Sequence, residues 1–321
     1  MKKIIAIVAG GDSSECGVSL KSAKGLMGFI PSDYEKYIVT VIGKNWNVQM
    51  TENEQITIDK NDFSFVKNGK KIIFDFAYIT IHGTPGENGV LQGYFDLIGL
   101  PYSCCGVLAA ALTFDKFACN NFLKNFDINV SPSMLFKNNQ NIDNEQIIEK
   151  LGLPIFVKPS NGGSSFGITK VKDKNQLQEA INKAFAEDCK VIIESFISGT
   201  EVTCGMYKTK EKNVIFPVTE VVTKNDFFDY DAKYKNKSEE ITPARISDEL
   251  TKNIQQTTAK IYDLIDAKGI IRVDYIIEKS GKIVLLEVNT TPGMTETSFI
   301  PQQVCAAGLD IQDVMREIIN S

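Results

Sequence analysis

Histidine is almost missing from this chain of 321 residues, which has one, at position 82. The seven cysteines include no CxxC pair. Structural zinc sites combine several cysteine and histidine ligands at short spacing, so this composition argues against a zinc site of that class. An odd number of cysteines, with Cys104 and Cys105 adjacent, is typical of reduced thiols. We therefore expect a cytoplasmic protein without a disulfide framework.

Long apolar runs and a strong net charge are also missing. The run 106–114 is among the longest, well short of the roughly 20 apolar residues that a membrane-spanning helix needs. The apolar run 4–9 is too short for a secretory signal, and no cleavage pattern follows it, so we expect a buried first strand. The formal net charge of −5 argues against a duplex nucleic acid as partner. We expect neither a membrane nor a nucleic acid partner.

Strand and helix patterns alternate along the first third of the chain. Strands are expected over 4–8, 37–42 and 74–81, and a helix follows from the spacing of Leu20, Ala23, Met27 and Ile30, with Asp12, Ser13 and Ser14 as its caps. Such alternation predicts an α/β fold with a mostly parallel sheet covered by helices. Ligands bind beyond the carboxyl ends of such strands, where the sequence places Gly10-Gly11 and His82-Gly83.

Further along the chain we expect strands over 155–159, 191–197, 202–207 and 214–222, with helices around 177–185 and 250–265. The stretch 138–146 reads as a surface turn. The stretch 224–242 is charged, aromatic and aperiodic, which predicts a long functional loop. We expect this loop to become ordered over bound ligands.

A hairpin near the end of the chain is the most informative segment. Two apolar runs, 270–278 and 283–289, flank a turn centred on Ser280-Gly281. Opposed residue numbers then sum to 561, so Asp274 faces Glu287 and Arg272 faces Asn289. Two facing carboxylates repel each other unless a cation lies between them, and Asp, Glu and Asn oxygens suit magnesium. A solvated strand face is the alternative, but Arg272, one of three arginines in the chain, is typical of a group that holds developing negative charge.

A glycine-rich loop, 158–167, lies between two expected strands. Its backbone N–H groups and hydroxyls could hold phosphate oxygens, although a plain hairpin loop is the alternative. The Walker A pattern fails, because Ile168 stands where its lysine belongs. Gly163-x-Ser165-x-Gly167 also matches the nucleophile elbow of hydrolases. We reject that reading because a strand, not a helix, follows the loop, and the single histidine lies upstream.

Together these segments resemble the D-alanine–D-alanine ligases of the ATP-grasp superfamily. The resemblance covers nearly the whole chain, and its motifs are specific through their joint order and spacing. They are Gly10-Gly11-Asp12-Ser13-Ser14-Glu15, Val18-Ser19-Leu20, His82-Gly83, Glu87-x-Gly89, Leu91-Gln92-Gly93, Leu100-Pro101-Tyr102, Asp115-Lys116, the loop 158–167, Asp229-Tyr230-x-Ala232-Lys233-Tyr234, Arg272-x-Asp274 and Glu287-x-Asn289-Thr290-x-Pro292-Gly293-Met294.

The resemblance implies an ATP-grasp fold of three α/β domains. These would be a substrate-binding domain over 1–105, a central ATP-grasp subdomain over 106–200 and a C-terminal subdomain with the metal site over 201–321. It implies the joining of two D-alanines through an acyl phosphate, for peptidoglycan synthesis, with ATP and two Mg²⁺ or Mn²⁺ ions. It also implies a homodimer. The alternatives left open are a D-Ala–D-Ser or D-Ala–D-lactate ligase, another ATP-grasp amino acid ligase, and a nucleotide-binding protein without catalysis.

The resemblance also assigns roles to single residues. The metal would be held by Asp274, Glu287 and Asn289. Phosphates would be held by Lys116, Lys158, Lys233 and the loop residue Ser165, the adenine by the hinge of Glu194, Ser195, Phe196 and Ile197, and the ribose by Glu201. The first substrate would be bound by Glu15, with Ser164 and Tyr234 linked to it and His82 nearby. The second carboxylate would be bound by Ser298, and the oxyanion by Arg272 and the N–H of Gly293.

Four of these residues have simpler readings. Glu15 could be a helix-terminal acid, His82 and Tyr234 could be packing residues, and Ser298 could be a helix cap. The sequence also departs from the family pattern at Cys16-Gly17, at Ser195 in the hinge and at Glu296-Thr297 before Ser298. Members that form depsipeptides tend to carry a histidine in the closing loop, where this chain has Lys233-Tyr234. The resemblance therefore implies that D-lactate is a poor acceptor.

Overall fold

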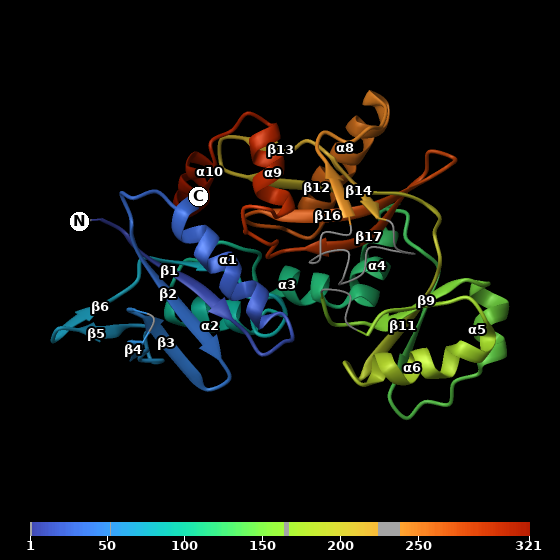
Figure 1. Ribbon diagram of the computed structural model, residues 1–321, viewed down its shortest axis with the longest axis horizontal. Coiled ribbons are helices and arrows are strands. Elements are labelled where there is room, and N and C mark those ends of the chain that lie inside the picture. Colours follow the sequence, from blue (N-terminus) through green and yellow to red (C-terminus); the bar gives the residue numbers. More distant parts are fainter. Residues whose placement is uncertain (1, 52, 164–166, 224–237) are drawn as a thin grey trace.

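The computed structural model describes residues 2–51, 53–163, 167–223 and 238–321. Within these ranges the chain forms a five-, a four- and a six-stranded sheet and a small two-stranded one. The first sheet lies at one end of the molecule, the second at the other end, and the third lies between and above them (Figure 1). Among the described residues, every helix is too short or too polar to cross a bilayer.

The first sheet has the strand order β4-β3-β2-β1-β7. Its strands are β1 Ile4–Gly10, β2 Glu35–Ile42, β3 Asn45–Gln49, β4 Gln55–Thr57 and β7 Phe76–Ile79, and the two-stranded sheet is β5 Phe65–Lys67 with β6 Lys70–Ile72. Pairing is parallel in β2-β1-β7 but antiparallel for β3 and β4. The sheet is therefore less parallel than predicted, because two residues connect β2 to β3, too few for a crossover.

Alternate residues of β1 face two different layers. Ile5 and Ile7 pack with Leu26 of α1 (Cys16–Phe29), whereas Ala6 and Val8 pack with Leu91 of α2 (Val90–Ile98). This period of two places one helix on each face of the sheet, as the sequence predicts. The prediction that Asp12, Ser13 and Ser14 cap α1 is wrong, because the next residue occupies the cap position.

Glu15 occupies the cap position of α1 without a side-chain capping bond. The Ser13 hydroxyl accepts from the Glu15 N–H and donates to the His82 carbonyl.

The second sheet is antiparallel, in the order β10-β9-β11-β8. It consists of β8 Ser133–Lys137, β9 Ile155–Pro159, β10 Thr169–Val171 and β11 Lys190–Ser195, with the helices α5 Asn144–Leu151 and α6 Leu177–Phe185 and the 3₁₀ turn Lys174–Gln176. The bounds of β9 and α6 match the predictions. Because β9 leads through the glycine-rich loop into a strand, the rejection of a nucleophile elbow is confirmed.

The third sheet has the order β15-β14-β12-β16-β17, with β13 beside β12. Its strands are β12 Gly199–Lys208, β13 Asn213–Ile215, β14 Thr219–Thr223, β15 Ser238–Ile241, β16 Ile271–Glu278 and β17 Ile283–Asn289, and its helices are α3 Val107–Phe114, α4 Lys116–Lys124, α8 Asp248–Leu264, α9 Phe299–Ala306 and α10 Ile311–Asn320. The predicted single strand 214–222 is two strands, because Pro217 between them has no N–H for a sheet.

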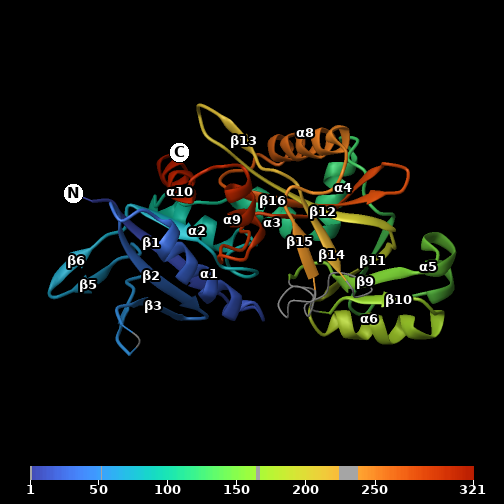
Figure 2. The same cartoon turned by 45° about the horizontal axis from the view of Figure 1, so that its top comes forward.

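Helix α4 lies within the range 106–200, the predicted central subdomain, but it packs against the third sheet. Cys119 and Leu123 of α4 share a core cluster with Val202 and Val273 of the third sheet. Figure 2 shows α4 beside this sheet. The domain boundaries at 105 and 200 stay a prediction.

The predicted loop 224–242 falls largely outside the described residues. Its last part, 238–241, is strand β15 and not loop, because it pairs with β14 from Glu220↔Ile241 to Thr223↔Ser238.

The hairpin of β16 and β17 confirms the predicted pairs at its open end. Arg272 faces Asn289 and Asp274 faces Glu287. Nearer the turn the register differs by one residue, because Tyr275 faces Leu285 and Leu286 is an extra residue on β17. This bulge changes the phase of β17: Leu285 and Val288 both face the core, and Glu287 and Asn289 face away from it.

Candidate active site

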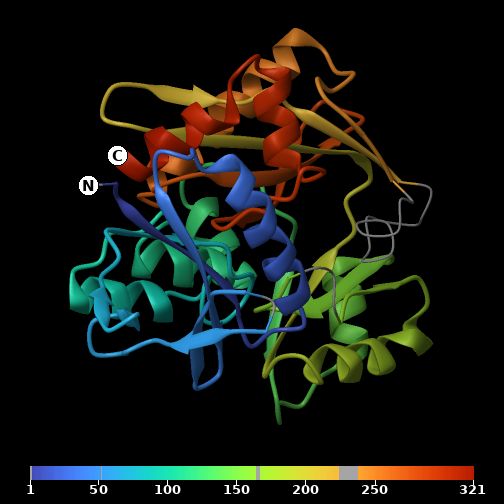
Figure 3. The same cartoon turned by 60° about the vertical axis from the view of Figure 1, so that its left-hand side comes forward.

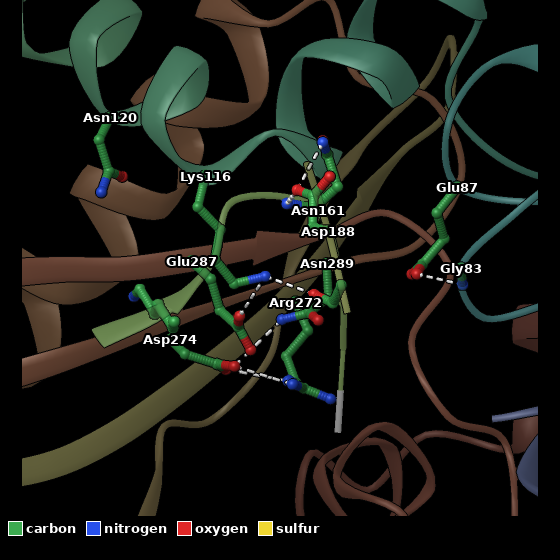
Figure 4. Close-up of polar contacts among 12 residues, drawn as sticks. Gly83, Glu87, Lys116, Asn120, Asn161, Asp188, Arg272, Asp274, Glu287 and Asn289 are labelled. Carbon is green, nitrogen blue, oxygen red and sulfur yellow. Dashed lines mark hydrogen bonds and ion pairs between the residues drawn. The ribbon is translucent and has the colours of Figure 1, made fainter. Parts of the chain in front are cut away.

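Asp274 lies at the centre of a hydrogen-bonded cluster on the third sheet (Figure 4). Arg272 donates from Nε to Oδ1 at 2.9 Å and from Nη2 to Oδ2 at 2.8 Å. Asn289 Nδ2 donates to Oδ2 at 3.0 Å. Thr203, which faces Asp274 from β12, donates to Oδ1 at 2.6 Å. The carboxylate is therefore fixed from three sides by charge-assisted and neutral hydrogen bonds.

Glu287, opposite Asp274, has a cation of its own. Lys116 Nζ lies 3.5 Å from Glu287 Oε2 and also donates to the Gly162 carbonyl. Lys116 is placed by the start of α4, where Asp115 accepts from the Ala118 N–H and pairs with Lys190 at 2.8 Å. In this structure Arg272 and Lys116 balance the two carboxylates that face each other.

The donor set suits a hard divalent cation. Asp274 and Glu287 supply carboxylate oxygens and Asn289 supplies an amide oxygen, all on one face of two paired strands. The described residues contain no cluster of three His, Cys, Asp or Glu side chains that could hold a metal by themselves. Mg²⁺ commonly binds one or two carboxylates and completes its shell with water and phosphate oxygens. The residues present therefore fit a metal that is shared with a phosphate ligand.

A cavity of about 430 Å³ lies between the second and third sheets. Its lining contains the sequence-predicted residues Lys116, Lys158, Glu194, Ser195, Phe196, Ile197, Glu201, Asp274 and Glu287. The buried Lys158 pairs with Glu194 at 2.6 Å. Asn120 of α4, which sequence reasoning missed, donates to the other oxygen of Glu194 at 3.3 Å.

Ser195 stands at a position where a lysine is common in the family. Its hydroxyl donates to the Leu151 carbonyl at 2.8 Å. Its own carbonyl accepts from Ser131.

A second cavity, of about 800 Å³, lies between α1 and the third sheet and is lined by Glu15, His82, Arg272, Gly293 and Ser298. Glu15 is buried beside the glycine-rich loop, where a Cβ on Gly163 would lie 2.3 Å from Glu15 Oε2. A side chain at position 163 would therefore displace the Glu15 carboxylate.

The other two predicted substrate residues also line this second cavity. Burial lowers the pKa of His82, so its imidazole is neutral near pH 7, and its Nε2 has no partner among the described residues. Ser298 precedes α9 but makes no side-chain capping bond, so the simple-cap reading is wrong.

Glu87 connects the loop after β7 to the segment after β17, and both line the second cavity. Its carboxylate accepts from the Gly83 N–H at 2.7 Å and from the Thr291 hydroxyl at 2.8 Å. Desolvation, together with repulsion by Glu15, raises the pKa of Glu87 to about 7. The motif Glu87-x-Gly89 marked this residue, but no sequence pattern pointed to its partner 204 positions away.

The Glu87→Gln variant should have a weaker dependence of stability on pH. The pKa of this carboxyl is higher in the folded chain than its ordinary 4.5, so Glu87 favours folding below about pH 4.5, and that contribution is lost as the pH rises through about 7. Glutamine keeps an oxygen for the Gly83 N–H. We expect the drop in the free energy of unfolding between about pH 5 and pH 8 to shrink by on the order of 2 kcal/mol.

Urea unfolding at both pH values measures this change, with the surface variant Glu278→Gln as control. An unchanged drop in the Glu87→Gln variant would contradict the assignment.

Four predicted site residues, Ser164, Ser165, Lys233 and Tyr234, lie outside the described residues. The described part of the glycine-rich loop is anchored by Asn161, whose backbone N–H and side-chain amide both donate to Asp188, at 2.8 and 3.0 Å. The other predicted residues line one or both cavities.

Two family models match this chain. The model described as D-ala D-ala ligase N-terminus covers residues 4–105, and that described as D-ala D-ala ligase C-terminus covers residues 122–320. A D-alanine–D-alanine ligase of Bacteroides fragilis is 62% identical over an alignment of 322 positions that covers 100% of this chain and 99% of the relative. One from Porphyromonas gingivalis is 54% identical over 99% of this chain and 97% of the relative.

Solved structures have the same fold. The VanG D-Ala:D-Ser ligase from Enterococcus faecalis superimposes with a TM-score of 0.89 at 32% identity, over 100% of this chain and 99% of the other. The D-alanyl-alanine synthetase A from Vibrio cholerae gives 0.89 at 26% identity, over 99% and 98%. The chain therefore belongs to the D-alanine–D-alanine ligase family, ATP-grasp enzymes that use ATP and a divalent metal.

Proposed function

We propose that the chain joins two D-alanines to D-alanyl-D-alanine for peptidoglycan synthesis, with ATP as the energy source. The observation that carries this proposal is that the two cavities meet at one place. Lys116, Arg272 and Glu287 line both of them. A nucleotide in the smaller cavity would thus direct its terminal phosphate toward a substrate in the larger one, next to the carboxylate pair.

The reaction has two steps. The carboxylate of the first D-alanine attacks the γ-phosphorus, which forms an acyl phosphate and releases ADP. The amine of the second D-alanine then attacks the acyl carbon, and a tetrahedral intermediate expels phosphate to leave the peptide bond. One or two Mg²⁺ or Mn²⁺ ions at Asp274, Glu287 and Asn289 would neutralise the transferring phosphoryl group.

The protein residues bind and orient the reactants. Lys116, Lys158 and Lys233 would hold phosphates as point charges, with Ser165 as a further donor. The adenine would lie against the hinge 194–197 and the ribose against Glu201. Glu15 would hold the first ammonium group, with His82, Ser164 and Tyr234 beside it.

The second substrate would be held at the other end of the larger cavity. Ser298 would bind its carboxylate, and Arg272 and the Gly293 N–H would stabilise the intermediate's oxyanion.

Phosphate release tests the proposed function. With ATP, magnesium and D-alanine, we expect stoichiometric phosphate and D-alanyl-D-alanine, and neither without D-alanine. A nucleotide-binding protein without catalysis would bind ATP and release no phosphate. Release of phosphate without dipeptide would favour another acceptor.

The acceptor preference should favour an amine over a hydroxy acid. The chain's one histidine, His82, lies in the larger cavity beside Glu15, so the segment 224–237 offers no imidazole for D-lactate. The amine must lose a proton before it attacks, so dipeptide formation should rise with pH above neutrality. We expect dipeptide to predominate when D-alanine and D-lactate compete at equal concentration near pH 7.

D-Serine should be included as a third acceptor in this competition. It differs from D-alanine by one hydroxyl, and a small pocket discriminates against one added hydroxyl only modestly. Predominant depsipeptide would contradict the acceptor assignment and leave the ligase assignment intact.

We propose that the chain forms a homodimer through α2 and α3. Val90 and Leu97, two turns apart on α2, are 61% and 88% exposed, and Leu108 on α3 is 80% exposed. A Cβ on Gly89, just before α2, would lie 2.7 Å from the Val107 carbonyl oxygen at the start of α3, so the first turns of these helices lie close together. Leu97→Lys with Leu108→Lys should give a monomer by light scattering, whereas Ile73→Lys, at an exposed site elsewhere, should not. A dimer that survives the double change would contradict this surface.

A further inference from the structure

The segment Gly293–Ser298 rests directly on α1. Gly25 lies in the third turn of that helix, and a Cβ atom there would be 2.3 Å from the carbonyl oxygen of Met294 and 3.4 Å from Thr295 Cα. Both neighbours are backbone atoms, which cannot rotate away as a side chain can. Glycine in a helix interior lowers stability relative to alanine, so its presence here allows the two backbones to touch.

Met294 is held to α1 at two further points. Its N–H donates to Ser22 Oγ at 3.3 Å. Its side chain is 1% exposed and belongs to the same core cluster as Ala23 and Leu26. The N–H and the carbonyl of Met294 therefore lie against α1, and its side chain shares the core cluster of that helix. Figure 3 shows α1, in blue, beside the red C-terminal part of the chain.

The position of Met294 determines the position of two proposed substrate groups. Gly293 immediately precedes it. On the other side, the Thr295 N–H donates to Ser298 Oγ at 3.0 Å, and the Thr295 hydroxyl lies 2.7 Å from the same oxygen. Displacement of Met294 would therefore move the Gly293 N–H and the Ser298 hydroxyl together.

We propose that Gly25 is a positioning residue for the second D-alanine. Its missing side chain sets the distance between α1 and the segment Gly293–Ser298, and thereby the depth of the second subsite. The inference rests on the proposed function. Because Glu15 lies at the start of the same helix, α1 would place both substrates relative to each other, as an attack distance within a few tenths of an ångström requires.

Two glycine-to-alanine variants test this proposal. In Gly25→Ala the added methyl pushes the segment away, and we expect the KM for the second D-alanine to rise about tenfold, with the KM values for ATP and for the first D-alanine changed by less than about twofold. The control is Gly28→Ala, one turn further along α1, where a Cβ would meet nothing within 4 Å. All three KM values should stay unchanged there. Helix propensity favours alanine at both positions, so a general effect on stability cannot produce this split.

The outcomes separate this inference from the proposed function. Absence of D-alanine-dependent phosphate release in the unaltered chain refutes the function, and the inference with it. If phosphate is released, two results for Gly25→Ala would overturn the inference and leave the proposed function intact. They are an unchanged KM for the second D-alanine, or equal changes in the KM values for ATP and for both D-alanines. Should circular dichroism show Gly25→Ala to be unfolded, Ser22→Ala decides. It removes the acceptor for the Met294 N–H and should raise the second KM about threefold, and no rise would overturn the inference.

Discussion

Glu287→Ala is expected to lower kcat by about a thousandfold, since a metal that neutralises phosphoryl charge contributes several kcal/mol to the transition state. The side chain is partly exposed and faces a cavity, so its loss leaves no hole in the core. Lys116 loses its carboxylate partner in this variant and becomes more available to phosphate. We therefore expect the loss in kcat and not in the KM for ATP.

Glu278→Ala provides the matched control for this variant. Glu278 lies on the same hairpin, at the turn end of β16, and should tolerate the change with full activity. Circular dichroism and thermal unfolding would confirm that both variants are folded. Turnover retained by Glu287→Ala at millimolar magnesium would contradict the metal assignment, whatever the activity of the control.

The second large effect is expected for Arg272→Lys. Arg272 uses Nε and Nη2 to hold Asp274 in a bidentate pair, and its guanidinium also lines both cavities. A lysine ammonium is a single point charge that cannot hold Asp274 at two points and reach a developing oxyanion as well. We expect kcat to fall about a hundredfold, as for the loss of one oxyanion donor.

The chain's few arginines offer a control for this change. Arg316→Lys alters an exposed residue on α10 that pairs with Asp33 and Asp313, so activity should remain within about twofold. Near-equal activity of the two lysine variants would refute the role of Arg272. A fall in activity confined to the KM for ATP would also refute it, because an oxyanion group acts on the later step.

The predicted register of the hairpin is correct for the pair Asp274 and Glu287, but it rests on a turn shorter than the observed one. The number 561 came from a two-residue turn, but Glu278 and Lys282 pair across three residues with Gly281 at φ +83°, which shifts the register by one. The extra residue Leu286 shifts it back before Glu287. The apolar residues Ile283, Leu285 and Val288 all face the core, although the last two are three positions apart instead of two. This irregular spacing is a signal for the bulge that is present in the sequence.

Partners brought together by distant strands and helices could not be predicted. Thr203 reaches Asp274 from a neighbouring strand, 71 positions away, and Asn120 reaches Glu194 from a helix, 74 positions away. Each is a common polar residue in an ordinary local pattern. Their function depends on which elements become neighbours, and that is decided by burial across the whole chain and not by local spacing.

The bulge at Leu286 separates the hairpin into two parts that can evolve independently. Side chains alternate between faces along a strand, so one residue gained or lost between the bulge and Asn289 would send the metal ligands into the core. The same change beyond the bulge, toward the turn, can be absorbed where the pairing is already irregular. Length variation among homologous hairpins should therefore concentrate in the turn, and the four residues from Leu286 to Asn289 should keep a fixed length.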